Sequence, residues 1–319
     1  MAHNDSSAHP IRPDVKAFLD FLNAKDAPDI ADMTLEQARA SFLRLGQLAE
    51  LPPRALALIR DLSAPGPAGV IPLRLYDARA DRSPGPAIMF FHGGGFVVGD
   101  LESHHALCTE IAAEMDLPVI AVDYRRAPEH PFPAAPDDCE AATRWIAGSP
   151  PELGRQVESL ILMGDSAGGN VTIVTTHALL DQPATVPVAL QVPIYPLSDD
   201  RHDHPSQLDF AKGFFLQGKS MRWFGEAYRA IRGHHRAFPI YNDHAATPPT
   251  VLVTAGLDPL RDSGRIYGEH LVRAGAELVY LEMKGVIHGF AQLRKAMPSA
   301  QDDLHSIFAA MRLLLERTR

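Results

Sequence analysis

The sequence predicts an α/β fold, in which helices cover both faces of a mostly parallel sheet. Short apolar runs recur along the chain and are separated by stretches long enough to form a helix. Such runs are typical of parallel strands, which are buried on both faces. We expect strands at Ala87–Phe91, Pro118–Val122, Leu160–Met163, Val188–Ile194, Thr250–Thr254 and Leu278–Met283. We expect helices at Ser103–Met115, Asp137–Ala147, Gly168–Leu180, Gly264–Ala274 and Ala300–Leu315.

Two segments depart from this alternation. Residues 1–62 have a helical pattern that includes the capping box Thr34-Leu-Glu-Gln37, and a turn-rich stretch follows them. Residues 197–246 hold no strand-like run and one expected helix near Met221–Ile231. Insertions of this length in a compact domain are usually functional. We therefore expect a sheet-containing domain over 63–319, with the other two segments forming a helical cap over the carboxyl edge of the sheet.

Composition excludes several classes of protein. The 319 residues are 46% hydrophobic, enough for one large core and a smaller accessory region. The net charge is −9 and no basic run exceeds Arg125–Arg126, so we expect no nucleic-acid partner. Cys108 and Cys139 form no C-x-x-C pair or disulfide framework. Met1–Pro10 is polar and no apolar stretch reaches about 18 residues, so we expect a cytoplasmic protein without a membrane span.

The strongest motif is Gly164-Asp165-Ser166-Ala167-Gly168, which lies between an expected strand and an expected helix. A G-x-S-x-G pattern in that context is typical of a nucleophile elbow, a sharp turn that exposes the serine hydroxyl at the sheet edge. The glycines leave room for the strained turn, and the helix N-terminus favours negative charge beside it. Ser166 is therefore the predicted nucleophile. The alternative interpretation is a small-residue turn that caps a helix.

A glycine-rich loop, His92-Gly93-Gly94-Gly95-Phe96, follows an earlier expected strand. In an acyl-transfer enzyme this position supplies an oxyanion donor, and glycines let backbone N–H groups approach the substrate. We expect the N–H groups of Gly94, Gly95 and Ala167 to form the oxyanion hole, and His92 to orient the loop. A nucleotide site fits poorly, because no lysine follows as in a P-loop and the glycines are out of register for a dinucleotide motif.

The expected partners of the serine follow later strands in the order aspartate, histidine. Asp258 comes after the fifth expected strand and His288 after the sixth. His288 would take the proton from Ser166, and Asp258 would orient the imidazole and stabilise its cation. Asp262 is the fallback acid or a supporting residue. The loop Asp199–His204 could suggest a metal site, but its spacing matches no standard ligand pattern, so we expect no metal.

Four elements together resemble the bacterial hormone-sensitive-lipase-like esterases, which are carboxylesterases of family IV. They are His92-Gly-Gly-Gly-Phe96, Gly164-Asp-Ser-Ala-Gly-Gly169, Asp258-Pro-Leu-Arg-Asp262 and His288-Gly-Phe290, and Asp123–Pro133 is a fifth. The resemblance begins near residue 67 and runs to the end of the chain. It implies an α/β-hydrolase fold with an eight-stranded sheet, one antiparallel strand and a helical cap. It also implies hydrolysis of short- or medium-chain acyl esters without a cofactor, and homodimers are common in the family.

The resemblance assigns Ser166, Asp258 and His288 to the catalytic triad and Gly94, Gly95 and Ala167 to the oxyanion hole. We expect His92, Asp165 and Asp262 to support these groups. The predicted function is thus a serine carboxylesterase that acts on a small-molecule ester through an acyl-enzyme, with an acyl pocket under the cap. An amidase or formamidase with the same triad is the alternative. A non-catalytic ligand-binding protein of this fold is a further alternative, although such proteins typically lose a triad residue.

Overall fold

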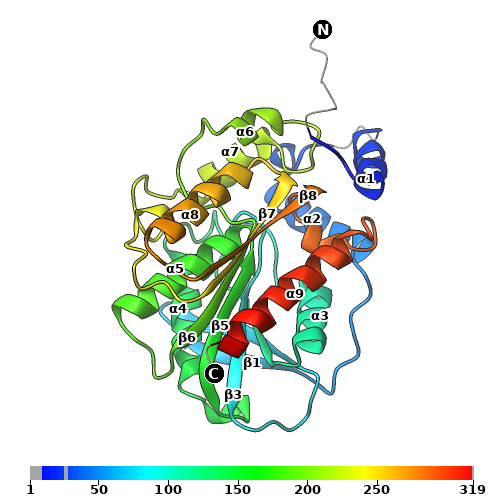
Figure 1. Ribbon diagram of the computed structural model, residues 1–319. Helices are drawn as coiled ribbons and strands as arrows, with labels where there is room; N and C mark the ends of the chain where they lie inside the picture. The colour runs from blue at the N-terminus through cyan, green and yellow to red at the C-terminus, as the bar shows by residue number, and fades with distance from the viewer. Residues whose placement is uncertain (1–8, 25–27, 318–319) are drawn as a thin grey trace.

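The computed structural model describes residues 9–24 and 28–317, and these form one eight-stranded sheet with helices on both sides (Figure 1). The strands are β1 (Leu58–Gly66), β2 (Gly69–Asp77), β3 (Gly85–Phe91), β4 (Val119–Val122), β5 (Val157–Asp165), β6 (Val188–Ile194), β7 (Thr250–Leu257) and β8 (Leu278–Ile287). Their order in the sheet is β1-β2-β4-β3-β5-β6-β7-β8. β2 is antiparallel to both neighbours, and the strands from β4 to β8 are parallel. The predicted mostly parallel sheet with one reversed strand is confirmed.

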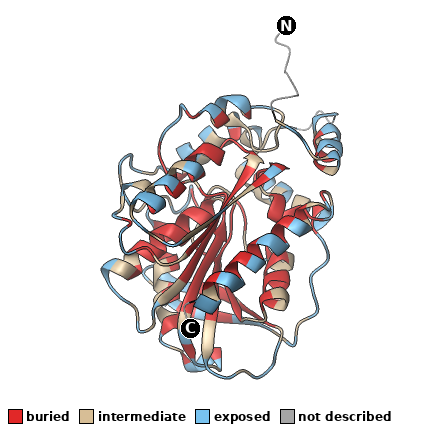
Figure 2. Ribbon diagram, viewed as in Figure 1, coloured by how far each residue is buried: buried red, intermediate tan, exposed pale blue. Residues whose placement is uncertain are grey.

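The helices form two layers and a cap. They are α1 (Pro13–Ala24), α2 (Leu35–Ala49), α3 (His105–Met115), α4 (Ala134–Ala147), α5 (Ala167–Asp181), α6 (Pro205–Asp209), α7 (Gly218–Tyr228), α8 (Arg261–Arg273) and α9 (Ala300–Arg317). Side chains alternate across β3, so that Ile88 and Phe90 pack with α3 and α9 while Met89 and Phe91 pack with α4 and α5. The central strands are consequently buried on both faces, whereas α1, α2, α8 and α9 keep an exposed outer side (Figure 2).

Strands β1 and β2 differ from the expectation, because β1 begins at Leu58 inside the stretch expected to be helical. They pair as an antiparallel hairpin through the turn at Gly66–Gly69. Buried and exposed residues alternate along much of both strands, so neither reads as a continuous apolar run. β1 is also an edge strand, which tolerates the proline at Pro65. The turn-rich stretch after residue 62 is therefore the hairpin itself rather than a domain boundary. A second difference is the five-residue helix α6, which lies in the 197–246 segment outside the one helix expected there.

The cap helices α1, α2, α6 and α7 lie at the end of the sheet toward which β7 and β8 point (Figure 1). The predicted capping box between Thr34 and Gln37 is present at the start of α2. From α2, Arg39 pairs with Glu129 and donates to the carbonyl of Val97 at 3.0 Å. These contacts hold the N-terminal segment directly on the loop that follows β3. No helix in the described parts of the chain has the length and apolar character needed to span a membrane. Met1–Pro10 lies mostly outside the described residues.

The N-terminal segment is also fixed by a buried ion pair. The side chains of Arg294 and Glu50 are 1% and 5% exposed, and Arg294 Nε donates to Glu50 Oε1 at 2.7 Å. Beside this pair, the carbonyl of Ala49 accepts the N–H groups of Lys295 and Ala296. The end of α2 is therefore joined to the loop that follows His288.

Because of this pair, we expect removal of residues up to Leu51 to destabilise the whole fold rather than only the cap. Loss of one partner of a buried ion pair costs about 3–5 kcal/mol, since the other charge stays buried. The point variant Glu50→Gln should lower the Tm by roughly 6–10 °C in calorimetry. Glu36→Gln, on the exposed side of α2, is the matched control and should leave the Tm within about 1 °C. A truncated chain with the Tm of the full-length protein would contradict the assignment.

A pair of buried histidines fixes the far end of α5. His177 Nε2 lies 3.1 Å from Nδ1 of His244, which belongs to the segment before β7. His177 is 6% exposed, and burial together with the neighbouring His244 lowers its pKa to about 4. His177 is consequently neutral in the folded protein at neutral pH.

We therefore expect stability to fall as pH falls from about 6.5 to about 4. In that window the unfolded chain binds a proton at His177 and the folded chain does not, so the unfolding free energy rises with pH. The pKa difference corresponds to roughly 3 kcal/mol. Urea unfolding of wild type and His177→Gln at pH 8 and pH 5 measures the effect. The variant should lose less stability between the two pH values, and equal losses would contradict the prediction.

Candidate active site

The predicted site residues stand directly after parallel strands, at one edge of the sheet. His92 follows β3, Ser166 follows β5, Asp258 follows β7 and His288 follows β8. The carboxyl ends of parallel strands meet at the same edge, so residues far apart in the chain converge there. Local sequence places each residue at its strand end, and the sheet register brings them together.

The turn at Ser166 is strained and closely packed. Its φ of 55° and ψ of −117° lie in a region that a residue with a side chain rarely adopts. A Cβ atom on Gly164 would come within 2.5 Å of the carbonyl oxygens of Phe91 and Gly168, and one on Gly168 would overlap Phe91. The N–H of Ser166 donates to Ile194 on β6 at 2.8 Å. The two glycines thus let the turn sit against β3 and leave the serine side chain free to point outward.

Ser166, His288 and Asp258 form one hydrogen-bonded chain. His288 Nε2 lies 2.9 Å from Ser166 Oγ, and His288 Nδ1 lies 2.6 Å from Asp258 Oδ2. Asp258 is fully buried and His288 is 6% exposed. The other carboxylate oxygen of Asp258 accepts the N–H of Leu260 at 2.8 Å. The carboxylate is therefore fixed on both oxygens, and the histidine is oriented toward the serine hydroxyl.

The three expected oxyanion donors lie on the loop after β3 and at the start of α5. Gly94 and Gly95 have φ values of 112° and 60°, in the region that glycine adopts most readily because it has no Cβ. The carbonyl of Gly94 accepts the N–H groups of Val97 and Val98, which closes the loop into a tight turn. Within the described residues, the N–H groups of Gly94, Gly95 and Ala167 donate to no protein acceptor. All three are consequently available to a bound anion.

His92 and Asp262 support the site without joining the hydrogen-bonded chain. His92 Nδ1 donates to the carbonyl of Gly93 at 2.8 Å, and its ring stacks on Tyr124 with 4.1 Å between centroids. Burial lowers the pKa of His92 to about 3, so the ring is neutral. Asp262 accepts the N–H of Ser206 at 2.8 Å and pairs with Arg261. Its carboxylate is thus engaged away from His288, whereas Asp258 contacts His288 directly.

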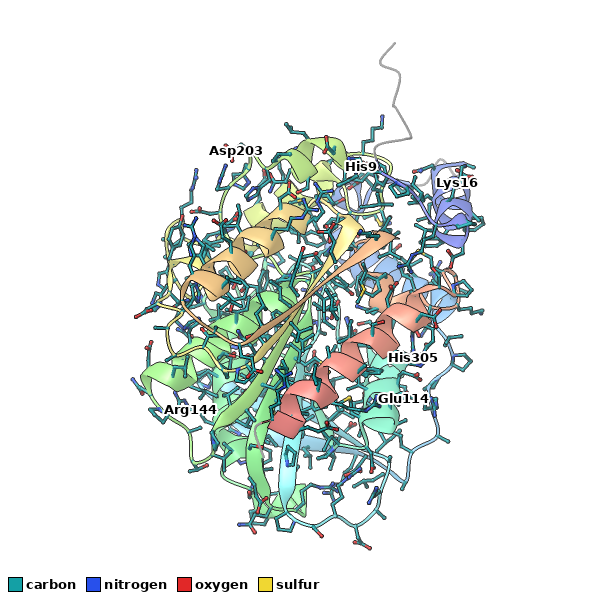
Figure 3. The ribbon with its side chains drawn as sticks, viewed as in Figure 1. His9, Lys16, Glu114, Arg144, Asp203 and His305 are labelled. Carbon is teal, nitrogen blue, oxygen red and sulfur yellow. The ribbon has the colours of Figure 1, made fainter. Side chains whose placement is uncertain are left out.

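The loop Asp199–His204, whose acidic residues and histidines could suggest a metal site, is held by hydrogen bonds between its own side chains. His204 Nε2 lies 2.9 Å from both carboxylate oxygens of Asp199. Among the described residues, one group has metal-ligand spacing, made of Glu110 and Glu114 on α3 and His305 on α9. Figure 3 shows that it lies low on the α3 and α9 side of the sheet, away from the cap. Arg54 already reaches both glutamates at 3.3 Å, so a cation would compete with an arginine there.

Three aromatic residues near the site were not predicted. Tyr195 directly follows β6, and its ring lies 4.7 Å from that of His288. Phe224 on α7 lies against Gly95, where an added Cβ would overlap its ring. Phe215 has a φ of 73°, and its ring is 3.3 Å from the Cβ position of Gly289. Only Tyr195 carried a sequence signal, its place at a strand end, because both phenylalanines reach the site through the folding of the cap.

Comparison with known proteins agrees with this geometry. The model of a family described as having the α/β-hydrolase fold matches residues 88–292. The esterase LipI of Mycobacterium tuberculosis is 34% identical over 279 residues, which are 85% of this chain and 87% of that protein. The ethyl acetate hydrolase of Pseudomonas putida is 32% identical over 94% of this chain and 98% of its own length.

Solved structures are similar over nearly the whole chain. The ester hydrolase EH1AB1 from the metagenome of Lake Arreo superposes with a TM-score of 0.88 at 33% identity, over 96% of this chain and 99% of that one. The hyperthermophilic esterase of Pyrobaculum calidifontis gives a TM-score of 0.87 at 32% identity, again over 96% and 99%. This chain therefore belongs to the hormone-sensitive-lipase-like family of α/β hydrolases and is a carboxylic-ester hydrolase.

Proposed function

We propose that this enzyme hydrolyses short- to medium-chain acyl esters through an acyl-enzyme, with Ser166 as nucleophile, His288 as base and Asp258 as acid. The observation that carries the proposal is the continuous chain from Asp258 Oδ2 through His288 to Ser166 Oγ, with separations of 2.6 Å and 2.9 Å. These are hydrogen-bond distances at which a proton can pass from the hydroxyl to the imidazole.

In the first half-reaction, Ser166 Oγ attacks the ester carbonyl carbon while its proton moves to His288 Nε2. The carbonyl oxygen becomes an oxyanion that the N–H groups of Gly94, Gly95 and Ala167 stabilise. His288 then gives the proton to the departing alcohol oxygen as the C–O bond breaks. Water repeats the sequence on the acyl-enzyme and releases the carboxylic acid. In both half-reactions, the carboxylate of Asp258 stabilises the imidazolium form of His288 for as long as the ring carries the extra proton.

Two phenylalanines of the cap support the preference for short acyl chains. Phe224 lies against Gly95 of the oxyanion loop, and Phe215 lies against Gly289 beside His288. Phe18 of α1 packs near Phe215, with ring centroids 6.4 Å apart. These side chains narrow the space on two sides of Ser166, and an ester with a long acyl group would have to displace them.

Esters rather than amides are the favoured substrates, because the similar proteins are named esterases, ethyl acetate hydrolase and carboxylic ester hydrolase. Turnover of an ester and its isosteric anilide separates the two classes. We further propose that the protein acts in the cytoplasm as a homodimer. The buried free thiols of Cys108 and Cys139 support a reducing compartment.

Ser166 is expected to be the one serine that reacts with a fluorophosphonate probe. Replacement of Ser166 by alanine should abolish labelling and lower kcat by at least about 10⁴-fold, because no other hydroxyl among the described residues is paired with a base beside the expected oxyanion donors. Ser306→Ala removes an exposed hydroxyl on α9 and is the matched control, which should label like wild type. Stoichiometric labelling of Ser166→Ala, read by intact-protein mass spectrometry, would refute the assignment.

Replacement of Phe215 by alanine should shift the enzyme toward longer acyl chains. The removed ring leaves room for several methylene groups, each worth about 0.8 kcal/mol when buried. We expect the ratio of kcat/KM for p-nitrophenyl octanoate over acetate to rise about ten-fold or more. Leu208→Ala is a matched cap variant whose side chain is 74% exposed, and its ratio should equal that of wild type. An unchanged chain-length profile in Phe215→Ala would place the acyl pocket elsewhere.

A further inference from the structure

The carboxylate of Asp165 contacts three segments that are distant in the chain. Asp165 directly precedes Ser166, and its side chain is 2% exposed. Its Oδ1 accepts the N–H of Gly93 on the oxyanion loop at 2.9 Å. Its Oδ2 accepts Nε2 of Gln292, four residues after His288, at 2.7 Å. One buried side chain therefore links the nucleophile turn, the oxyanion loop and the loop that carries the base.

Gly93 shows how closely the oxyanion loop approaches this carboxylate. An added Cβ on Gly93 would overlap Oδ2 of Asp165 and lie 2.9 Å from its carbonyl oxygen. The φ of Gly93, unlike those of Gly94 and Gly95, is not positive. Glycine is therefore required at this position for the close approach to Asp165, and not for its backbone conformation.

His104 is a third partner of the carboxylate. Its Nε2 lies 3.2 Å from Asp165 Oδ1 and 3.2 Å from the backbone nitrogen of Gly93. Its Nδ1 lies 2.9 Å from the hydroxyl oxygen of Ser103, which in turn donates to the carbonyl of Asp100. The imidazole of His104 is therefore held between Ser103 and the contact that joins Asp165 to the oxyanion loop.

The charge on Asp165 is favoured in spite of its burial. Burial by itself raises the pKa of a carboxyl, but the attraction of His104 and the hydrogen bonds from His104 and Gly93 outweigh it and leave the pKa of Asp165 below its usual value. An ionised carboxylate makes stronger hydrogen bonds than a neutral acid. The contacts to Gly93 and Gln292 are consequently charge-assisted.

We propose that Asp165 is a positioning residue, whose carboxylate holds the N–H groups of Gly94 and Gly95 in register with Ser166 and His288. This inference rests on the proposed function of those residues. Asp165 touches no reacting atom. Asp165 is the residue directly before Ser166 in the chain. Any movement of the oxyanion loop or of the His288 loop relative to Ser166 would therefore break a hydrogen bond to the buried charge of Asp165.

A charge-relocation experiment tests the proposal. In Asp165→Asn, the side-chain oxygen still accepts the N–H of Gly93, but the new NH₂ group faces the NH₂ group of Gln292. Two donors then face each other, and the hydrogen bond to Gln292 is lost. The double variant Asp165→Asn with Gln292→Glu restores that hydrogen bond with the donor and acceptor exchanged. Asp77→Asn is the matched control, because Asp77 is a fully buried carboxylate paired with Arg82 and Arg155 at the opposite end of the parallel strands.

The readouts are kcat and KM for p-nitrophenyl acetate, and Ki for a trifluoromethyl ketone whose adduct with Ser166 places an oxyanion in the hole. We expect Asp165→Asn to lower kcat about 10- to 100-fold and to raise Ki by a similar factor, with KM changed less than three-fold. The double variant should recover most of both losses. Asp77→Asn should lower the Tm and leave kcat and Ki within about two-fold of wild type.

A kcat loss in Asp165→Asn no larger than in Asp77→Asn, or no recovery in the double variant, would overturn the proposal. Fluorophosphonate labelling keeps the two hypotheses distinguishable. Failure of wild type to label at Ser166 refutes the proposed function, whereas a labelled Asp165→Asn with wild-type kcat and Ki refutes the positioning role alone. Should Asp165→Asn not fold, Gln292→Leu removes one donor and keeps the charge. Its kcat should fall several-fold with unchanged KM, and a wild-type kcat would overturn the proposal.

Discussion

The strained turn at Ser166 is the constraint on which the rest of the site depends. A residue with a φ of 55° persists only where its surroundings leave no relaxed alternative. Here the surroundings are the carbonyl of Phe91 on β3, the hydrogen bond from the Ser166 N–H to Ile194 on β6, and helix α5, which starts at the next residue. Because the neighbouring parallel strands hold the turn from both sides, the packing of the sheet is what keeps the Ser166 side chain at the sheet edge.

Three buried histidines at the site differ in role because they differ in partners. His92 stacks on Tyr124 and donates to a backbone carbonyl, which leaves it neutral and structural. His104 lies between Ser103 and Asp165, where it helps to hold the carboxylate of Asp165 in place. His288 also lies between a carboxylate and a hydroxyl, but its hydroxyl belongs to Ser166 on the strained turn, next to the N–H groups at the start of α5. Residue type alone does not distinguish these three.

The N-terminal segment is an integral part of the packed fold and not a separable cap. Glu50 pairs with the buried guanidinium of Arg294, which also lies 3.4 Å from Glu110, while Arg39 reaches the loop that follows β3. Phe18 packs near Phe215, which in turn borders the loop of His288. These contacts connect the cap to the loops that follow β3 and β8, so the position of these loops and the stability of the hydrolase core depend on the same residues.

Local pattern was enough to place six of the eight strands, the elbow at Ser166, the glycine loop after β3, and the aspartate and histidine at later strand ends. Each is encoded within a few residues, as an apolar run or as glycine where the backbone must turn or approach another closely. Strands β1 and β2 were missed because they alternate and belong to an edge hairpin. Tertiary structure decided three other features of the site: the preference for Asp258 over Asp262, the position of Phe215, and the partners of Asp165. They are contacts between residues 30 to 127 positions apart in the chain, or the absence of such contacts, and they form only when the register of the sheet and the docking of the cap bring those segments together.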